Sequence, residues 1–165
     1  MVNLSVLKES DKSEKRVALV PESVKKLSKN GVSILVEEGA GIEAGFKLEE
    51  YINAGAKITS DRNEILKCDI ILGVQLNLLK EVELDKLMES QNDSILIGFF
   101  NPFNDIKNIN LLASKNLTCF SMELIPRISR AQRMDALSAM SSAAGYKAVL
   151  LAATSLNKFF PLMMT

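Results

Sequence analysis

The sequence contains no histidine and no tryptophan, and only two of its 165 residues are cysteines. Without histidine, the chain lacks the commonest general base, the Ser–His and Cys–His nucleophile pairs, and the usual zinc ligand. Cys68 and Cys119 each lie inside an apolar run, KCDIIL and LTCFSM. This favours buried, reduced thiols over a disulfide or a metal site. Any chemistry must therefore come from a bound molecule or from residues outside the chain, and we expect no metal.

Net charge and long apolar runs are also lacking. Twenty Lys and Arg balance twenty Asp and Glu, so the chain has no electrostatic footprint for nucleic acid or an anionic membrane. We find no apolar stretch of the roughly 18 to 20 residues that a membrane span needs. The N-terminus has no signal-peptide core. We therefore expect one cytoplasmic domain with no nucleic-acid partner and no direct membrane insertion.

Short β-branched runs alternate with helical stretches along the chain. The patterns predict strands at 2–9, 32–39, 56–60, 69–75, 94–100 and 117–124, and helices at 21–31, 48–55, 61–68, 82–90 and 105–116. The strands are almost continuously apolar, which is typical of a parallel sheet covered on both faces. The sequence therefore predicts a three-layer, doubly wound α/β fold with a mainly parallel sheet, of the flavodoxin-like or Rossmann-like kind.

A long run of helix formers, residues 134–156, follows the last predicted strand. A helix of about 20 residues spans about 30 Å, which is more than the sheet requires. An apolar tail, NKFFPLMMT, comes after it. The run is either a helix packed on the core or a connector to a second domain, and we favour the connector. We expect an α/β subdomain at 1–133 and a connector helix with its tail at 134–165.

The segment GAGIEAG, residues 39–45, is superficially like a dinucleotide fingerprint. Its spacing is G-x-G-x-x-x-G, Glu43 would repel phosphate, and the next predicted helix begins only near Lys47. We therefore interpret the segment as a glycine-rich turn between a strand and a helix.

Three of the five arginines lie in the segment PRISRAQRMDALS, between a predicted strand and the long helix. Ligands bind at this kind of position in α/β folds. Arg127 offers planar donors, Gln132 offers a donor and an acceptor, and Asp135 lies one turn from Ser138 on the same helix face. The alternative is a solvated loop whose charges balance nearby acids. Arg16, in the loop after the first strand, could similarly bind a carboxylate or belong to a solvated loop.

The segments KRVALVPESVKKL, VEEGAGIEAGF and MELIPRISRAQRMDALS, together with the closing FFPLMMT, resemble the NAD(H)-binding component of proton-translocating nicotinamide nucleotide transhydrogenases. The resemblance covers essentially the whole chain. In that family two Rossmann-like subdomains enclose the dinucleotide, and this chain is similar to the first, with the true glycine fingerprint in the second. The resemblance implies direct hydride transfer from NADH to NADP⁺ held on another component, coupled to proton translocation.

The same resemblance implies the site residues, in the loop 126–135 and the first helical turn. Arg127 and Ser138 would contact the nicotinamide carboxamide region, Asp135 the ribose side, and Gln132, as the catalytic residue, would orient the two nicotinamides. Ile128 and Ser129 would lie alongside through their backbone. The implied partners are the NADP(H)-binding and membrane components and, in the full-length protein, a second copy. The chain would be peripheral to the inner membrane, and the isolated fragment would be inactive.

Two alternatives remain. Alanine dehydrogenases share the R-V-A-x-x-P and glycine segments, and they hold their keto acid with a lysine and a histidine. This chain has Gly73 where many relatives carry the lysine, and GFFNPF without histidine after the next strand. These departures count against an alanine dehydrogenase-like enzyme. A non-catalytic α/β interaction module is the third hypothesis.

Overall fold

The computed structural model describes residues 2–89, 94–115 and 117–158, and the expected tail from Phe159 onward lies outside them. Six strands alternate with helices in the order that the sequence predicts. In chain order the elements are β1 (Asn3–Val6), α1 (Pro21–Lys29), β2 (Ser33–Glu37), α2 (Leu48–Asn53), β3 (Lys57–Thr59), α3 (Arg62–Leu66), β4 (Ile70–Gln75), η1 (Leu76–Leu78), α4 (Glu81–Glu89), β5 (Ile95–Phe99), α5 (Ile106–Ser114), β6 (Thr118–Ser121), η2 (Met122–Leu124), η3 (Ser129–Met134) and α6 (Ala136–Ser155).

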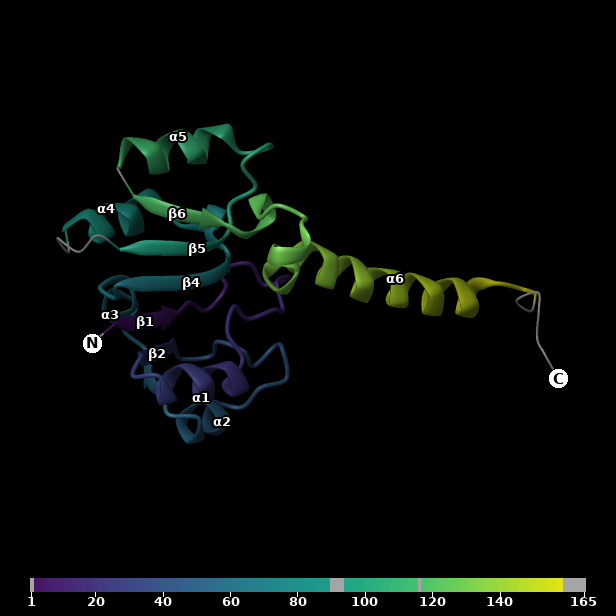
Figure 1. The fold of residues 1–165 in the computed structure, drawn as a ribbon, viewed down its shortest axis with the longest axis horizontal. Coiled ribbons are helices and arrows are strands. Elements are labelled where there is room, and N and C mark those ends of the chain that lie inside the picture. The colour runs from purple at the N-terminus through teal and green to yellow at the C-terminus, as the bar shows by residue number, and fades with distance from the viewer. Residues whose placement is uncertain (1, 90–93, 116, 159–165) are drawn as a thin grey trace. The chain divides into compact units, whose positions relative to one another are not determined.

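The strands form one parallel sheet in the order β3-β2-β1-β4-β5-β6 (Figure 1). The chain builds outward from β1 to β3 and then returns to β4 on the other side of β1. In such doubly wound sheets, ligands bind beyond the carboxyl ends of the strands, near this change of direction. The predicted three-layer α/β fold is confirmed.

Helices cover both faces of the sheet, and each face has its own core. Alternate residues of β4 show this, because Ile71 belongs to one core while Ile70 and Leu72 pack against the other. Val24 of α1 and Tyr51 of α2 are fully buried in the core over β1 and β2. The opposite core contains residues from α3, α4 and α5: Ile65, Leu66, Leu84, Leu87 and Leu112. Burial of these aliphatic side chains is the main force that holds the layers together.

The segment 39–45 is a turn between β2 and α2, as predicted. Gly39, Gly41 and Gly45 all have positive φ, between 83° and 89°. Such angles are unfavourable for residues with a side chain. At Gly41 the close packing of Tyr51 is a second constraint, since a Cβ would lie 2.5 Å from the Tyr51 hydroxyl. The turn is therefore shaped by backbone conformation and packing.

The chain divides into two compact units, residues 1–121 and 122–165. The sheet forms the first unit, whereas η2, η3 and α6 belong to the second. The expected boundary at 133–134 stays a prediction.

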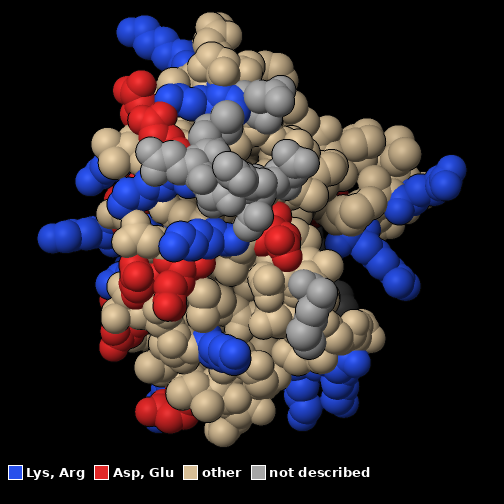
Figure 2. Space-filling view, turned by 90° about the vertical axis from the view of Figure 1, so that its left-hand side faces the viewer, with Lys and Arg blue, Asp and Glu red and all other residues tan. Residues whose placement is uncertain are grey.

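On the face drawn in Figure 2, Lys and Arg side chains lie among Asp and Glu side chains.

Helix α6 corrects the expectation that no stretch of the chain is apolar and long enough to span a membrane. Its 20 residues are long and apolar enough, by length and composition alone, to cross a membrane, and none of them is buried. The sequence analysis missed this stretch because many of its residues are Ala and Ser, which are only weakly apolar or polar. Its one charged residue is Lys147. Core helices of soluble proteins, which are mostly buried, pass the same test of length and composition, so that test does not assign α6 to a membrane.

Candidate functional site

Within the second unit, three of the predicted site residues lie together at the start of α6. Asp135 is the N-cap of α6, and its Oδ1 accepts a hydrogen bond of 2.9 Å from the backbone N–H of Ser138. The Ser138 hydroxyl donates to Asp135 Oδ2 at 2.6 Å. Arg127 Nε lies 3.9 Å from the same Oδ2. The loop therefore brings a guanidinium, a carboxylate and a hydroxyl into one cluster.

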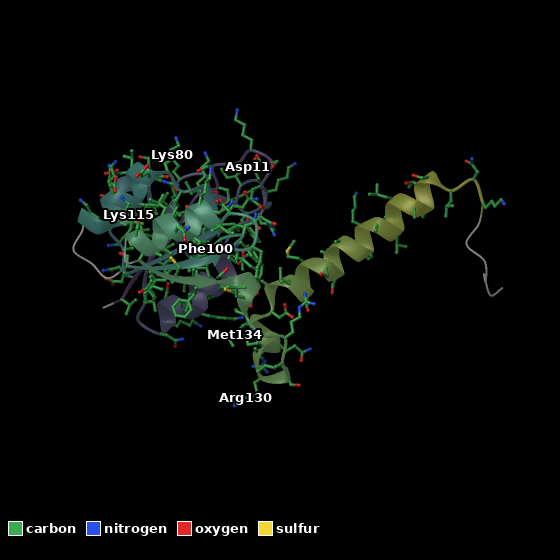
Figure 3. The ribbon with its side chains drawn as sticks, turned by 90° about the horizontal axis from the view of Figure 1, so that it is seen from above. Asp11, Lys80, Phe100, Lys115, Arg130 and Met134 are labelled. Carbon is green, nitrogen blue, oxygen red and sulfur yellow. The ribbon has the colours of Figure 1, made fainter. Side chains whose placement is uncertain are left out.

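The other predicted residues lie on or beside η3. Ile128 is the N-cap of η3, and the backbone N–H of Ala131 donates to its carbonyl at 2.9 Å. Ser129 and Gln132 are exposed on η3 itself. Figure 3 marks the same segment by Arg130 and Met134, at the approach to α6. The sequence predicted a turn here, and the 3₁₀ helix within it was not foreseen.

The side chains of this cluster differ in exposure. The Arg127 side chain is 62% exposed, whereas the Asp135 carboxylate is only 10% exposed. Hydrogen bonds from Ser138 hold the pKa of the Asp135 carboxyl below its ordinary value, with a further contribution from the Arg127 charge. Asp135 is therefore an anion at neutral pH, and Arg127 and Ser138 are the more exposed members of the cluster.

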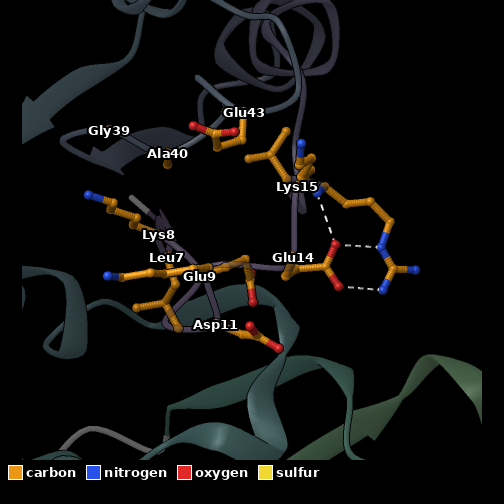
Figure 4. Close-up of a pocket in the computed structure, with 13 residues that line it drawn as sticks. Leu7, Lys8, Glu9, Asp11, Glu14, Lys15, Gly39, Ala40 and Glu43 are labelled. Atoms are coloured by element: carbon orange, nitrogen blue, oxygen red, sulfur yellow. Dashed lines mark hydrogen bonds and ion pairs between the residues drawn. The ribbon is translucent and has the colours of Figure 1, made fainter.

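A pocket of about 410 Å³ lies in the first unit, beyond the carboxyl ends of β1 and β2 (Figure 4). It is lined by the loop after β1, between Leu7 and Val17, and by the glycine turn, between Gly39 and Glu43. Both basic and acidic residues line its wall. Because the strand ends of a doubly wound sheet are the usual ligand position, this pocket is the second candidate region.

The ion pair between Glu14 and Arg16 forms one wall of this pocket. Arg16 Nε and Nη2 donate to the two Glu14 oxygens at 2.7 and 2.5 Å, and Gln75 of β4 donates to Glu14 Oε2 at 2.9 Å. The guanidinium also lies 5.6 Å from the centre of the Phe99 ring. Hydrogen bonding from Arg16 lowers the pKa of Glu14 to about 2. Arg16 therefore does bind a carboxylate, but one that its own chain supplies.

Glu14 and Gln75 were missed from the sequence. The spacing of Glu14 and Arg16, two residues apart in one loop, was the available signal. Gln75 gave none, because it lies 61 residues from Glu14 along the chain. Glu9 was missed for the same reason: its two carboxylate oxygens accept from the backbone N–H groups of Val74 and Gln75 at 2.7 and 3.0 Å.

The position of Gly73 is closely packed. A Cβ at this residue would lie 2.5 Å from Cδ2 of Leu76, which is buried. A lysine therefore cannot replace Gly73 unless Leu76 moves.

Both cysteines are free: Cys68 is buried and Cys119 is half-buried, and burial raises the pKa of the Cys119 thiol to about 11. Among the residues that the structure describes, no cluster of three or more His, Cys, Asp and Glu side chains could hold a metal ion.

The chain matches a known protein family and several known proteins. Residues 5–144 match the model for the family described as alanine dehydrogenase/PNT, N-terminal domain. The chain is 41% identical over 165 residues to the first part of the NAD(P) transhydrogenase alpha subunit from Rickettsia prowazekii, covering 99% of this chain and 43% of that protein. It is 30% identical over 155 residues to alanine dehydrogenase of Bacillus subtilis, covering 94% and 39% respectively.

A solved structure agrees with the sequence relatives. The crystal structure of transhydrogenase from Sinorhizobium meliloti matches with a TM-score of 0.85 and 37% identity, over 99% of this chain and 47% of that one. The chain therefore spans less than half the length of the proteins that it matches.

Proposed function

Because this chain belongs to the alanine dehydrogenase/PNT N-terminal domain family, we propose that it is the N-terminal part of the NAD(H)-binding component of a proton-translocating transhydrogenase. Its role is to position NADH for direct hydride transfer to NADP⁺ on another component. The observation that carries the proposal is 41% identity, over 99% of the chain, to a transhydrogenase alpha subunit. Identity to an alanine dehydrogenase is lower, at 30%.

The residues of the loop and first helical turn fit a nicotinamide. Arg127 supplies exposed donors only, whereas the exposed side chains of Gln132 and Ser138 also carry acceptor atoms. A primary carboxamide needs both kinds of partner. We assign Arg127 and Ser138 to this carboxamide, Asp135 to the ribose side of the same cluster, and the backbone of Ile128 and Ser129 to the adjacent surface.

The hydride itself would come from bound NADH, so the work of this chain is orientation. Holding two reacting groups in line can lower the activation barrier considerably, because it converts a bimolecular reaction into an effectively unimolecular one. Gln132, on η3 with an exposed side chain, is the residue that we assign to orienting the two nicotinamides. This role needs no ionisable base, which is in keeping with a chain without histidine.

The whole assembly follows from the same proposal. A second subdomain beyond α6 would complete the NAD(H) cleft, so residues 1–165 alone should bind NADH weakly and turn nothing over. The partners would be the NADP(H)-binding and membrane components and, in the full-length component, a second copy. The chain would then lie in the cytoplasm, peripheral to the inner membrane through the complex.

A two-substrate assay tests the function. The full-length component is mixed with the NADP(H)-binding component, and hydride transfer from NADH to an NADP⁺ analogue is followed beside oxidation of L-alanine by NAD⁺. We expect transfer without alanine oxidation, and we expect Gln132→Asn to slow transfer far more than it lowers thermal stability. Alanine oxidation without transfer would overturn the proposal in favour of an alanine dehydrogenase. Equal losses of rate and stability in the variant would make the loop structural.

A further inference from the structure

Both oxygens of the Asp135 carboxylate are engaged by a single residue. Oδ1 accepts from the backbone N–H of Ser138 at 2.9 Å, and Oδ2 accepts from its hydroxyl at 2.6 Å. The first bond is an ordinary N-cap, which satisfies a free N–H at the start of α6. The second bond is not needed for capping. Its consequence lies in the direction in which the Ser138 hydroxyl proton points.

An ionised carboxylate can only accept hydrogen bonds, so the proton between these two oxygens belongs to Ser138. A hydroxyl has one proton and two lone pairs. With its proton directed at Asp135, the exposed Ser138 oxygen can offer only lone pairs to a ligand. The low pKa of Asp135 keeps this arrangement in place at neutral pH.

Arg127 offers the opposite polarity in the same cluster. Its guanidinium has donors only, and 62% of the side chain is exposed. At 3.9 Å the Nε of Arg127 is too far from Asp135 Oδ2 for a hydrogen bond, so the guanidinium donors stay available. The cluster therefore presents a donor from Arg127 and an acceptor from Ser138, with a negative charge directly behind the acceptor.

We propose that Asp135 is a positioning residue that makes this cluster select a carboxamide over a carboxylate, by fixing the Ser138 hydroxyl as an acceptor. The inference rests on the proposed function, since it takes the ligand group facing Arg127 and Ser138 to be that of nicotinamide. A carboxamide presents an oxygen to Arg127 and an N–H to Ser138. A carboxylate presents oxygen to both, so one oxygen meets the lone pairs of Ser138 and the charge of Asp135. Asp135 therefore acts through Ser138.

The substitution Asp135→Asn should reverse the polarity while keeping the cap. The asparagine Oδ1 can still accept from the backbone N–H of Ser138, and its Nδ2 can donate to the hydroxyl oxygen. The Ser138 proton is then free to point at the ligand, and the negative charge behind it is gone. Asp105 provides a matched control, because it caps α5 in the same way, accepting from the N–H of Asn108 at 3.2 Å.

The test measures the dissociation constants of NAD⁺ and of nicotinic acid adenine dinucleotide, its carboxylate analogue, for the full-length component. We expect the wild type to prefer NAD⁺ by about tenfold or more, as for a ligand that leaves a polar group unpaired. Asp135→Asn should reduce this preference about tenfold, and Asp105→Asn should leave it unchanged. In a Ser138→Ala background, Asp135→Asn should lose most of its effect on the preference.

The outcomes separate the two proposals. If NAD⁺ binds and Asp135→Asn weakens both dinucleotides by the same factor, Asp135 acts as a helix cap or on the ribose that both ligands share, so the inference is wrong while the proposed function stands. An unchanged effect of Asp135→Asn in the Ser138→Ala background would also overturn it. If the wild type binds neither dinucleotide, the proposed function fails and this inference fails with it.

Discussion

The carboxylate of Glu14 holds the guanidinium of Arg16 through two hydrogen bonds, of 2.7 and 2.5 Å. The Glu14 side chain is 5% exposed, and Gln75 of β4 donates to it from the other side of the loop. The pair therefore ties the loop after β1 to β4. It also ties the loop to β5, because the guanidinium lies over the ring of Phe99.

This relationship predicts how stability depends on pH. The pKa of Glu14 is lowered to about 2 in the folded chain by the hydrogen bond from Arg16. The stabilisation is therefore complete above the ordinary glutamate pKa and is lost as the pH falls from about 4.5 to about 2. It amounts to at most about 3 kcal/mol. Urea unfolding across this pH range should show a decline in the wild type that Glu14→Gln reduces.

Glu22→Gln is the control for the pH experiment. Glu22 pairs with Lys26 at 2.6 Å, but both side chains are more than 70% exposed, and exposed pairs contribute little. We expect the Glu22→Gln curve to run parallel to that of the wild type. If the Glu14→Gln curve runs parallel as well, the Glu14–Arg16 pair does not stabilise the loop.

The glycine turn gives a second prediction, from two residues with similar backbone and different surroundings. Gly41 and Gly45 have φ of 83° and 89°, but a Cβ at Gly41 would lie 2.5 Å from the Tyr51 hydroxyl, whereas nothing lies within 4 Å at Gly45. Gly45→Ala should cost about 1 kcal/mol of unfolding free energy for its backbone. Gly41→Ala should cost about 1–3 kcal/mol more for its overlap with Tyr51. Equal costs in thermal or urea unfolding would show that Tyr51 does not constrain the turn.

Most of the fold could be predicted because its signals are local. Pro21 begins α1, Gly31 follows its end with a φ of 82°, and the apolar run 70–74 forms most of the interior strand β4. The short helices η1 and η2 were not foreseen. They directly follow β4 and β6, where the sequence has no capping or helix-breaking residue that would indicate a single tight turn.

The sites were less predictable, because they depend on contacts between distant segments. Arg62 shows this: it bonds Glu37 at 2.5 Å and Glu83 at 2.8 Å, 25 and 21 residues away. Asp135 shows a different limit. Its position at the start of the helix was foreseen, although it is the N-cap and not a residue of the first turn. Its dual bond to Ser138 depends on a hydroxyl rotamer that no spacing reveals.

Packing around Gly73 gives a third prediction. A Cβ there overlaps the Leu76 side chain, so Gly73→Ala should cost about 1–3 kcal/mol, as for other overpacked cores. The cost should shrink when Leu76 is first replaced by alanine, which removes the atom in contact. Unfolding free energies of the two single variants and the double variant measure this coupling. Strictly additive effects would show that Leu76 does not restrict the side chain at position 73.

The most direct test of the central claim is hydride transfer with and without Arg127. The full-length component, mixed with the NADP(H)-binding component, is assayed for transfer from NADH to an NADP⁺ analogue as the wild type, Arg127→Ala and Arg130→Ala. Arg130 is exposed on the same segment and serves as the control. We expect Arg127→Ala to lose at least about tenfold in rate and Arg130→Ala to stay near wild type. Equal rates in all three proteins would contradict the placement of a nicotinamide at this loop.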